Sequence, residues 1–357
     1  MTPVALQPLP RAADAVLTDV SVCNDVAAWD HYVLARTECP LFHRAAWRTV
    51  WNVYGLPSLP LAAWRNGRIV GVLPLVRQAS RLTGRQLVSL PWCDGVGILA
   101  DDDAARSALA QAAMGLTRDW KADSVQIRER NASNLSPHVR TDKLLMELPL
   151  ERSSETLWKR LSSKVRNQVR KAEKSDLHVA VGKAELLDEF FEVYSRNMRD
   201  LGSPSHSPDI FLAVARAFPA EVRVWIVRLG RQAVGAGLTL ANGTALEIPW
   251  ASSLRKANSL CVNHLMYWRI LEQACRDGFA TFRFGRSTEG SGQHHFKKQW
   301  GAAETPLHWY FLSESAEQAQ AAAAPPQERL GWAGRIWQRL PLAVSRRVGP
   351  KIMAGIP

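Results

Sequence analysis

The sequence predicts two similar α/β halves, each a mixed, mostly antiparallel sheet flanked by helices, followed by a basic amphipathic C-terminal segment. The chain has 357 residues, which suits two domains of roughly 150 to 200 residues better than one. Strand-like and helix-like segments alternate along it. A weak internal repeat of about 160 residues relates RNGRIVGVLPL (65–75) to RLGRQAVGAGLTL (228–240). A chance likeness between two α/β segments is the alternative explanation of this repeat.

The first half is assigned to residues 1–150 and is expected to be a scaffold or the acceptor side. Asp25 is a candidate helix cap, and Asn66-Gly67 between apolar runs predicts a tight hairpin, because both central positions of that turn need positive φ. The expected elements are a loose tail (1–15), a strand (16–22), helices (25–35, 41–54), a hairpin (61–65, 68–76), a strand (86–90), a helix (101–120) and a strand (124–130).

The second half, residues 151–315, repeats this order and is expected to carry the active site. Asp277-Gly278 predicts the end of a helix. The expected elements are a basic helix (154–174), a strand (177–181), helices (184–200, 208–218), strands (222–228, 232–241, 244–251), a helix (260–276), a strand (281–285) and a last strand (307–312).

Residues 316–357 read as a linker, broken by Pro325-Pro326, and a basic amphipathic segment. Trp332, Ile336, Trp337 and Leu340 lie at helical spacing among arginines. Such a segment either docks on the body of the protein or contacts an anionic membrane surface through about residues 329–351. Both alternatives stay open on the sequence.

Composition narrows the class of protein. The formal net charge is +12, which favours anionic partners such as phosphorylated cofactors, RNA or an acidic membrane face. The five cysteines are scattered without metal-ligand spacing, so no metal is expected and the thiols suit a reducing compartment. No secretory signal or spanning segment is evident. The expected location is the cytoplasm, with contact at the inner membrane face as the alternative.

The first polar segment is SSKVRNQVRKAEKS (162–175). Arg166 and Arg170 are four residues apart and therefore share one helix face, which suits phosphate or nucleic-acid backbone. They are the first candidates for anion binding. An ordinary solvated helix face is the alternative.

The second segment, FRFGRSTEGSGQHHFKKQWG (282–301), follows a strand and gathers polar residues that a core does not need. Gly290 and Gly292 allow backbone amides to approach an anion. We expect substrate binding by three cations and proton transfer by a carboxylate or an imidazole. The candidates are Arg286, Lys297 and Lys298 for binding, and Glu289 and His294 for catalysis.

The third segment runs from a strand near 246–251 into the helix at 260–276. A helix N-terminus that follows a strand favours anions, and Asn263 lies in the first turn. Trp250, Tyr267 and Trp300 are candidates for lining the acceptor channel, with plain core packing as the alternative for the aromatic residues. No hydrolase elbow, metalloprotease motif or dinucleotide fingerprint is evident, which fits group transfer by positioning.

The segments LSSKVRNQVRKAEKS, NHLMYW and FGRSTEGSGQHHFKKQWG resemble the FemAB-related proteins of exosortase/PEP-CTERM gene neighbourhoods, within the GNAT-like acyltransferase superfamily. The resemblance covers nearly the whole chain and implies tandem GNAT-like domains. It also implies an acyl-CoA or aminoacyl-tRNA donor, an amine acceptor and work on exopolysaccharide or surface protein. The chain departs from FemAB enzymes proper in lacking their long helical-hairpin insertion that contacts tRNA. The basic helix at 154–174 is the nearest counterpart.

Three functions follow. The first is an N-acyltransferase acting on a small-molecule, glycan or peptide amine. The second is a non-catalytic protein that binds an anionic polymer or a membrane surface for an export system. The third is an aminoacyl-tRNA-dependent peptide ligase. The donor, the acceptor and the oligomeric state are not determined by the sequence.

Overall fold

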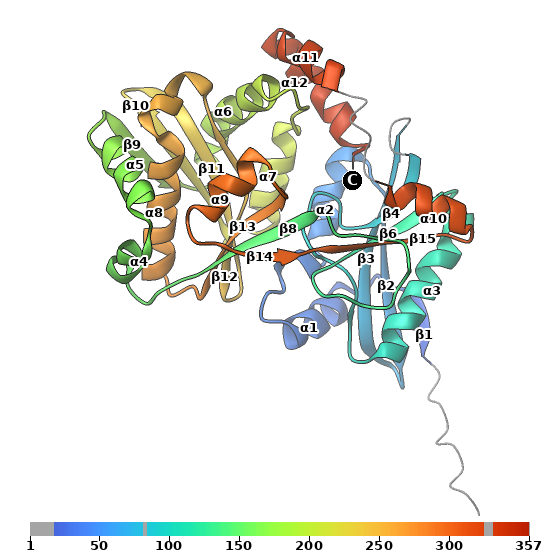
Figure 1. Cartoon of the computed structure of the whole chain (residues 1–357). Helices are drawn as coiled ribbons and strands as arrows, with labels where there is room; N and C mark the ends of the chain where they lie inside the picture. Colours follow the sequence, from blue (N-terminus) through green and yellow to red (C-terminus); the bar gives the residue numbers. More distant parts are fainter. Residues whose placement is uncertain (1–17, 81–83, 325–330, 357) are drawn as a thin grey trace, which may run out of the picture.

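The computed structural model describes residues 18–80, 84–324 and 331–356, and these form two sheets flanked by helices (Figure 1). The first sheet has the order β1-β2-β3-β4-β6-β15-β7, with β5 paired to β3. Its strands are β1 (Asp19–Val22), β2 (Ser58–Arg65), β3 (Arg68–Ser80), β4 (Gly84–Ser89), β5 (Leu99–Ala100), β6 (Ser124–Glu129), β7 (Val139–Arg140) and β15 (His308–Leu312).

The second sheet has the order β14-β8-β13-β12-β11-β10-β9. Its strands are β8 (Lys143–Pro149), β9 (Leu177–Gly182), β10 (Val222–Leu229), β11 (Gln232–Asn242), β12 (Ala245–Ser253), β13 (Thr281–Thr288) and β14 (Ala303–Pro306).

The helices of the first half are short except for one. They are α1 (Val26–Arg36), η1 (Leu41–His43), α2 (Trp47–Trp51), η2 (Asn52–Tyr54) and α3 (Asp103–Asp119). The second half and the C-terminal segment contain α4 (Ser154–Arg160), α5 (Ser163–Glu173), η3 (Ala184–Leu186), α6 (Leu187–Asp200), α7 (Pro208–Ala217), η4 (Arg255–Leu260), α8 (Val262–Arg276), α9 (Gly292–Lys298), α10 (Ala316–Ala323), α11 (Gly331–Gln338) and α12 (Leu342–Met353).

The two sheets repeat one topology, which confirms the predicted fold class. The hairpin β2–β3 corresponds to β10–β11, and the parallel pair β4–β6 corresponds to β12–β13. The first hairpin turns at Asn66 (φ 49°) and Gly67 (φ 72°), as the sequence predicts, since a tight turn of this kind needs positive φ at both positions. The alignment of 65–75 with 228–240 therefore reflects equivalent hairpins.

One strand crosses between the sheets in each direction. Strand β8 leaves the first half and pairs with β13 and β14 of the second sheet. Strand β15 returns from the end of the second half and pairs with β6 and β7 of the first sheet. In Figure 1 these strands run in the middle of the molecule, between the two groups of helices. The expected boundary near residue 150 thus lies between elements of one sheet and not between two independent sheets.

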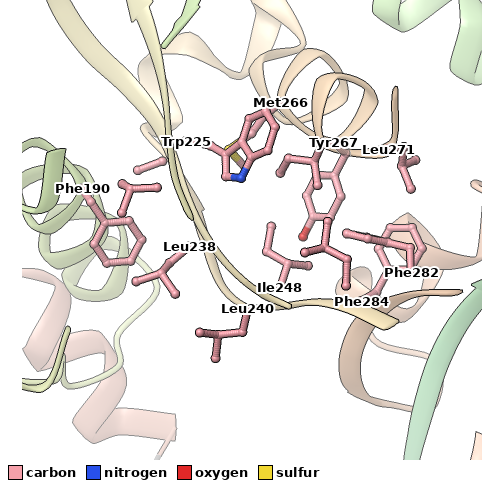
Figure 2. Close-up of a cluster of buried hydrophobic side chains, with 14 of the residues drawn as sticks. Phe190, Trp225, Leu238, Leu240, Ile248, Met266, Tyr267, Leu271, Phe282 and Phe284 are labelled. Carbon is pink, nitrogen blue, oxygen red and sulfur yellow. The ribbon is translucent and has the colours of Figure 1, made fainter. Parts of the chain in front are cut away.

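Helices cover both faces of the second sheet because its strands are apolar on both sides. Phe190 of α6 and Leu238 of β11 lie on one side of the strand ribbon, and Tyr267 of α8 lies on the other (Figure 2). Phe190, Leu238 and Met266 have no exposed surface. The core-packing interpretation of Met266 and its neighbours is therefore correct, although Tyr267 also reaches a cavity described below.

Several expected elements differ from the structure for local reasons. The single helix predicted at 154–174 is two helices, because Leu161 is extended and the Ser162 side chain caps α5 by accepting from the Val165 N–H. The polar loop after β13 contains the helix α9, which Ser291 caps by accepting from the His294 N–H. Residues 316–323 of the expected linker are helical. The tail at 1–15 and Pro325-Pro326 lie outside the described residues.

The C-terminal helices α11 and α12 pack on α6, above the junction of the two halves (Figure 1). Within the described part of the chain, no helix combines the length and the apolar character that crossing a membrane requires.

Candidate functional site

The parallel strands β12 and β13 separate after three residue pairs, and this separation leaves an opening in the second half. Pairing runs from Ala245 opposite Thr281 to Glu247 opposite Arg283. Beyond that point β12 continues beside β11, whereas β13 continues beside β8. Among the described residues, the backbone of β12 from Ile248 onward therefore has no partner strand on its β13 side.

A cavity of about 800 Å³ occupies this separation. Its walls come from β12, β13, the end of α6, η4, the start of α8, and α9. The first half contributes Trp92 and Asp94, and the C-terminal helix α12 contributes Met353. The volume lies in the range typical of small-molecule and cofactor sites.

Asp94, Arg286 and Lys297 form the charged centre of the cavity. Asp94 accepts hydrogen bonds from the Arg286 backbone N–H (2.7 Å) and from its guanidinium (3.0 Å). The Lys297 ammonium donates to the carbonyl oxygens of Gly285 (3.1 Å) and Arg286 (2.8 Å). Burial lowers the pKa of Lys297 to about 8; Asp94 opposes this shift and Arg286 adds to it. A substantial neutral fraction of this amine is present at mildly alkaline pH.

Tyr267 lines the same cavity from α8 and donates no hydrogen bond to any described residue. Burial raises the pKa of its hydroxyl, so the hydroxyl stays protonated throughout the physiological range. Figure 2 shows this hydroxyl directed toward Ile248 of β12. Tyr267 is therefore a proton donor without a protein partner at the wall of the cavity.

The N-terminus of α8 gives one end of the cavity an anion-binding character. Cys261, Val262, Asn263 and His264 line the cavity at the first turn of this 15-residue helix. Cys261 adopts φ 60°, which lets the short helix η4 turn sharply into α8. The Asn263 Oδ1 and His264 Nε2 atoms are buried and have no hydrogen-bond partner among the described residues. A ligand that reaches this end meets unsatisfied polar atoms.

An aromatic wall closes the side of the cavity that faces the first half. The rings of Trp92 and His206 lie 4.7 Å apart, and Trp250 packs edge-on against Phe211 at 5.2 Å. His206 is 3% exposed, and burial lowers its pKa to about 3, so the ring is neutral. Its Nδ1 lies 3.3 Å from the Tyr54 hydroxyl. Both halves of the chain therefore build this wall.

Part of the sequence-predicted site lies together. The residues that line the cavity are Arg286, Lys297, Trp250, Tyr267, Asn263 and Gly292. The remaining candidates lie outside its lining. Glu289 and Gly290 are in the exposed turn after β13, Trp300 is buried behind the wall against Tyr267, and Arg166 and Arg170 lie on α5.

The periodicity of α9 explains which of its residues reach the cavity. Gln293 and Lys297 are four residues apart and line it. His294 and Lys298 occupy an adjacent face and both approach Glu304, at 3.2 and 2.7 Å. His294 also accepts from the Gly290 N–H at 3.0 Å. His294 and Glu289 therefore both lie outside the cavity lining.

Sequence reasoning missed Asp94, Trp92, His206 and Met353. Asp94 and Trp92 stand in the loop PWCDGVGI after β4. By the internal repeat, this loop corresponds to the segment between β12 and α8, which the sequence marks as a candidate. That correspondence was the available signal for Asp94; His206 and Met353 carried none, because each reaches the cavity only through tertiary packing.

The equivalent opening in the first half is filled by a side chain of the protein. Strands β4 and β6 also pair in parallel over only three residues, from Gln86 opposite Ser124 to Val88 opposite Gln126. Just beyond this point Arg128 is completely buried. It donates to the Cys93 carbonyl at 3.2 Å and lies 4.4 Å from the centre of the Trp309 ring. At the equivalent position of the first sheet, the Arg128 side chain therefore occupies space beside the end of the parallel pair.

Among the described residues, no group of three or more His, Cys, Asp or Glu side chains is arranged to hold a metal ion. The five cysteines are free thiols.

Residues 159–298 match the acetyltransferase (GNAT) domain family. No curated protein matches the sequence. Among solved structures, FemX has a TM-score of 0.63 at 15% identity, covering 83% of this chain and 98% of that one. The C-terminal domain (DUF2156) of a putative lysylphosphatidylglycerol synthetase from Agrobacterium fabrum has 0.56 at 11% identity, with coverages of 83% and 94%. A tandem GNAT protein from the clavulanic acid biosynthesis pathway has 0.52 at 13% identity, with coverages of 84% and 100%.

At sequence identities of 11–15%, the similarity to these structures establishes the fold of this chain but does not identify its substrates. The family match spans α5 to α9 and so contains the separation of β12 and β13 together with Arg286 and Lys297. The chain thus has a tandem GNAT-like fold, and residues 159–298 in its second half are similar to the acetyltransferase (GNAT) domain family.

Proposed function

We propose that the protein is an N-acyltransferase of the GNAT type, in which an amine attacks the activated carbonyl of a donor inside the cavity between β12 and β13. The observation that carries this proposal is the separation of these strands, with the α8 N-terminus at one end and the Arg286–Lys297 centre beside it. An acyl-CoA is the donor that this geometry supports best.

The donor occupies the open edge of β12. Residues 248–253 of β12 offer unpaired backbone groups on this side, which suit the amide groups of an extended pantetheine arm. The donor's phosphates lie at the α8 N-terminus, near Arg255, because the helix dipole and the free amides favour negative charge there.

The reaction needs a proton acceptor and a proton donor. Attack forms a C–N bond and breaks the C–S bond of the thioester, so the amine loses one proton and the departing sulfur gains one. Neutral Lys297 is placed to accept the amine proton, since two backbone carbonyls hold its nitrogen. Tyr267 is placed to give a proton to the sulfur. Arg286, held by Asp94, binds an anionic group of the acceptor.

The acceptor enters on the side of the aromatic wall formed by Trp92, His206 and Trp250. A small-molecule, glycan or peptide amine fits this role. The association with an exosortase/PEP-CTERM system and with exopolysaccharide rests on the sequence resemblance alone.

Binding of the donor is tested by thermal shift with acetyl-CoA, longer acyl-CoAs, charged tRNA and uncharged tRNA at fixed salt. A specific ligand at about 100 times its dissociation constant stabilises by about 2.7 kcal/mol. We expect a salt-resistant shift with one acyl-CoA and transfer to an amine that is lost in Lys297→Ala. Lys298→Ala is the matched control, because Lys298 is the next residue of the same helix and lies outside the cavity. Unchanged binding and turnover in Arg286→Ala and Lys297→Ala would refute the site.

Aminoacyl transfer is the second candidate, and the exposed cationic face of α5 favours it. The cations of α5 and its C-terminal cap form no ion pair with a carboxylate within the described residues and are available to a polyanion: Lys164, the half-buried Arg166, Arg170, Lys171 and Lys174. The FemX structure and the putative lysylphosphatidylglycerol synthetase domain share the two-sheet fold. Transfer that disappears after ribonuclease treatment, with no shift by any acyl-CoA, would establish this candidate. Salt-sensitive binding without any transfer would instead indicate a non-catalytic binding protein.

A further inference from the structure

The outward face of the C-terminal helices combines cations and apolar side chains. On α12, Val344, Arg347, Val348 and Lys351 are spaced three or four residues apart and are all exposed, with Val344 at 42% and Val348 at 38%. On α11 the exposed Ile336 follows the exposed Arg335, and the exposed Arg339 lies just after the helix ends. Residues 331–356 contain five basic residues and no acidic residue. We call these seven exposed residues the α11–α12 face.

The opposite side of α12 packs against the second half of the protein. Arg346 donates to the Ser195 hydroxyl at 2.9 Å and pairs with Glu192, both on α6. A Cβ placed on Gly349 would lie 2.9 Å from the backbone nitrogen and oxygen of Ser205, so the helix sits in close contact there. The α12 part of the α11–α12 face is therefore the outer side of a helix that packs closely on α6 and Ser205.

The docked helix also forms part of the cavity wall. Met353 lines the cavity, and the Ile356 carbonyl accepts a hydrogen bond of 2.7 Å from the Trp92 indole, which lines it as well. The α11–α12 face is thus separated from the cavity by the thickness of one helix.

We propose that the α11–α12 face binds the surface of an anionic lipid bilayer while the helices remain docked. Basic and apolar side chains that alternate along one helix face are typical of helices that lie in the plane of a membrane interface. The cations complement the negative surface potential of anionic lipids, and the valines and Ile336 enter the boundary of the acyl chains. A nucleic acid matches the charge but leaves three exposed apolar side chains without a partner.

Bound in this way, the protein holds its cavity beside the bilayer, since Met353 belongs to the same helix as Val348 and Lys351. This inference concerns a surface separate from the Arg286–Lys297 centre, and its test needs no enzymatic activity.

The test is co-sedimentation of the full chain with vesicles of phosphatidylcholine alone and of phosphatidylcholine mixed with phosphatidylglycerol. We expect binding only to the mixed vesicles and weakening by salt. Each cation near such a surface contributes about fivefold, so Arg347→Glu with Lys351→Glu is expected to weaken binding by more than about tenfold. Val344→Ser with Val348→Ser is expected to weaken it several-fold at unchanged net charge.

The matched control is Lys159→Glu with Arg231→Glu, which changes the net charge equally at exposed positions on α4 and the β10–β11 turn. It is expected to bind as the unmodified protein does. Equal loss in the control and in the α12 charge variant would overturn the proposal, because net charge alone would then explain binding. The proposal would be overturned in favour of a polyanion site if the valine substitutions left binding to mixed vesicles unchanged. Complete displacement of the protein from the vesicles by a single-stranded RNA would have the same meaning. No binding to mixed vesicles would overturn it outright.

Discussion

Replacing Lys297 by methionine tests the buried ammonium at the centre of the cavity. The pKa of Lys297 falls from 10.5 to about 8, a difference that corresponds to roughly 3 kcal/mol between the charged and neutral forms. Since the folded-state pKa is the lower one, the unfolded chain binds more protons between pH 8 and pH 10.5. The contribution of Lys297 to stability is therefore least favourable below pH 8 and improves as the pH rises through that window.

Methionine removes the charge and also two hydrogen bonds to the carbonyls of Gly285 and Arg286. Each unpaired carbonyl costs about 1–3 kcal/mol, so the two cost about 2–6 kcal/mol, against a gain of roughly 3 kcal/mol from removing the charge below pH 8. We therefore expect the free energy of unfolding of Lys297→Met at pH 7 to lie between about 1 kcal/mol above and about 3 kcal/mol below that of the unmodified protein. As the pH approaches 10.5, this difference is expected to shift by up to about 3 kcal/mol in favour of the unmodified protein.

The assay is urea unfolding of both proteins at several pH values between 7 and 10.5. The difference between the two free energies of unfolding is the informative quantity, because every other titrating group is shared and cancels. A difference that does not change with pH would refute the reasoning that Lys297 is held partly neutral, and with it the proton-acceptor role. If that role holds, the transfer rate rises with pH and levels off above about pH 8, where the amine is neutral.

Three further predictions concern separate parts of the molecule. Tyr267→Phe is expected to lower the transfer rate about 10²–10⁴-fold with an unchanged melting temperature, because its hydroxyl bonds no described residue; an unchanged rate would exclude it as proton donor. Gly349→Val is expected to cost about 1–3 kcal/mol and to expose α12 to limited proteolysis, since the new Cβ meets the Ser205 backbone; resistance equal to the unmodified protein would contradict this close contact. Arg283→Met is expected to cost about 3–5 kcal/mol in urea unfolding at neutral pH and less in acid, because it removes the only cation paired with Glu247 among the described residues, at 2.7 Å; Glu147 keeps its ion pair with Arg130. A loss that does not shrink in acid would show that packing, not charge, dominates there.

The fold was largely predictable because its signals are local. Asn66-Gly67 marks one hairpin, and Asp277-Gly278 ends α8, where Gly278 adopts φ 79°. The exchange of β8 and β15 was not predictable. KLLMELP and HWYFL are ordinary apolar strands, and nothing within them specifies which sheet they join.

The candidate site was predictable where its residues follow one strand. Arg286 and Lys297 belong to one polar segment and both line the cavity. Within the same segment, the sequence favoured Glu289 and His294 on chemistry alone. The helix α9, which the sequence did not reveal, turns His294 toward Glu304 and leaves it outside the cavity lining. Asp94 joins the site from 192 residues away in the chain, a distance that only the fold closes.

The crossing of β8 and β15 has a consequence for how this chain is made. The edge of β6 that β15 covers stays bare until residues 308–312 have been synthesised, long after the rest of the first sheet is available. A fragment that ended at residue 150 would leave the edge of β6 uncovered. Its last strand, KLLMELP, is largely apolar and would lack β13 and β14, the strands with which it pairs. The halves are similar in topology, yet each sheet contains a strand from the other half of the chain. Neither half can therefore be inherited, expressed or deleted with its sheet complete. Any gene duplication that gave rise to them must have been followed by this exchange, or must have carried it from the start.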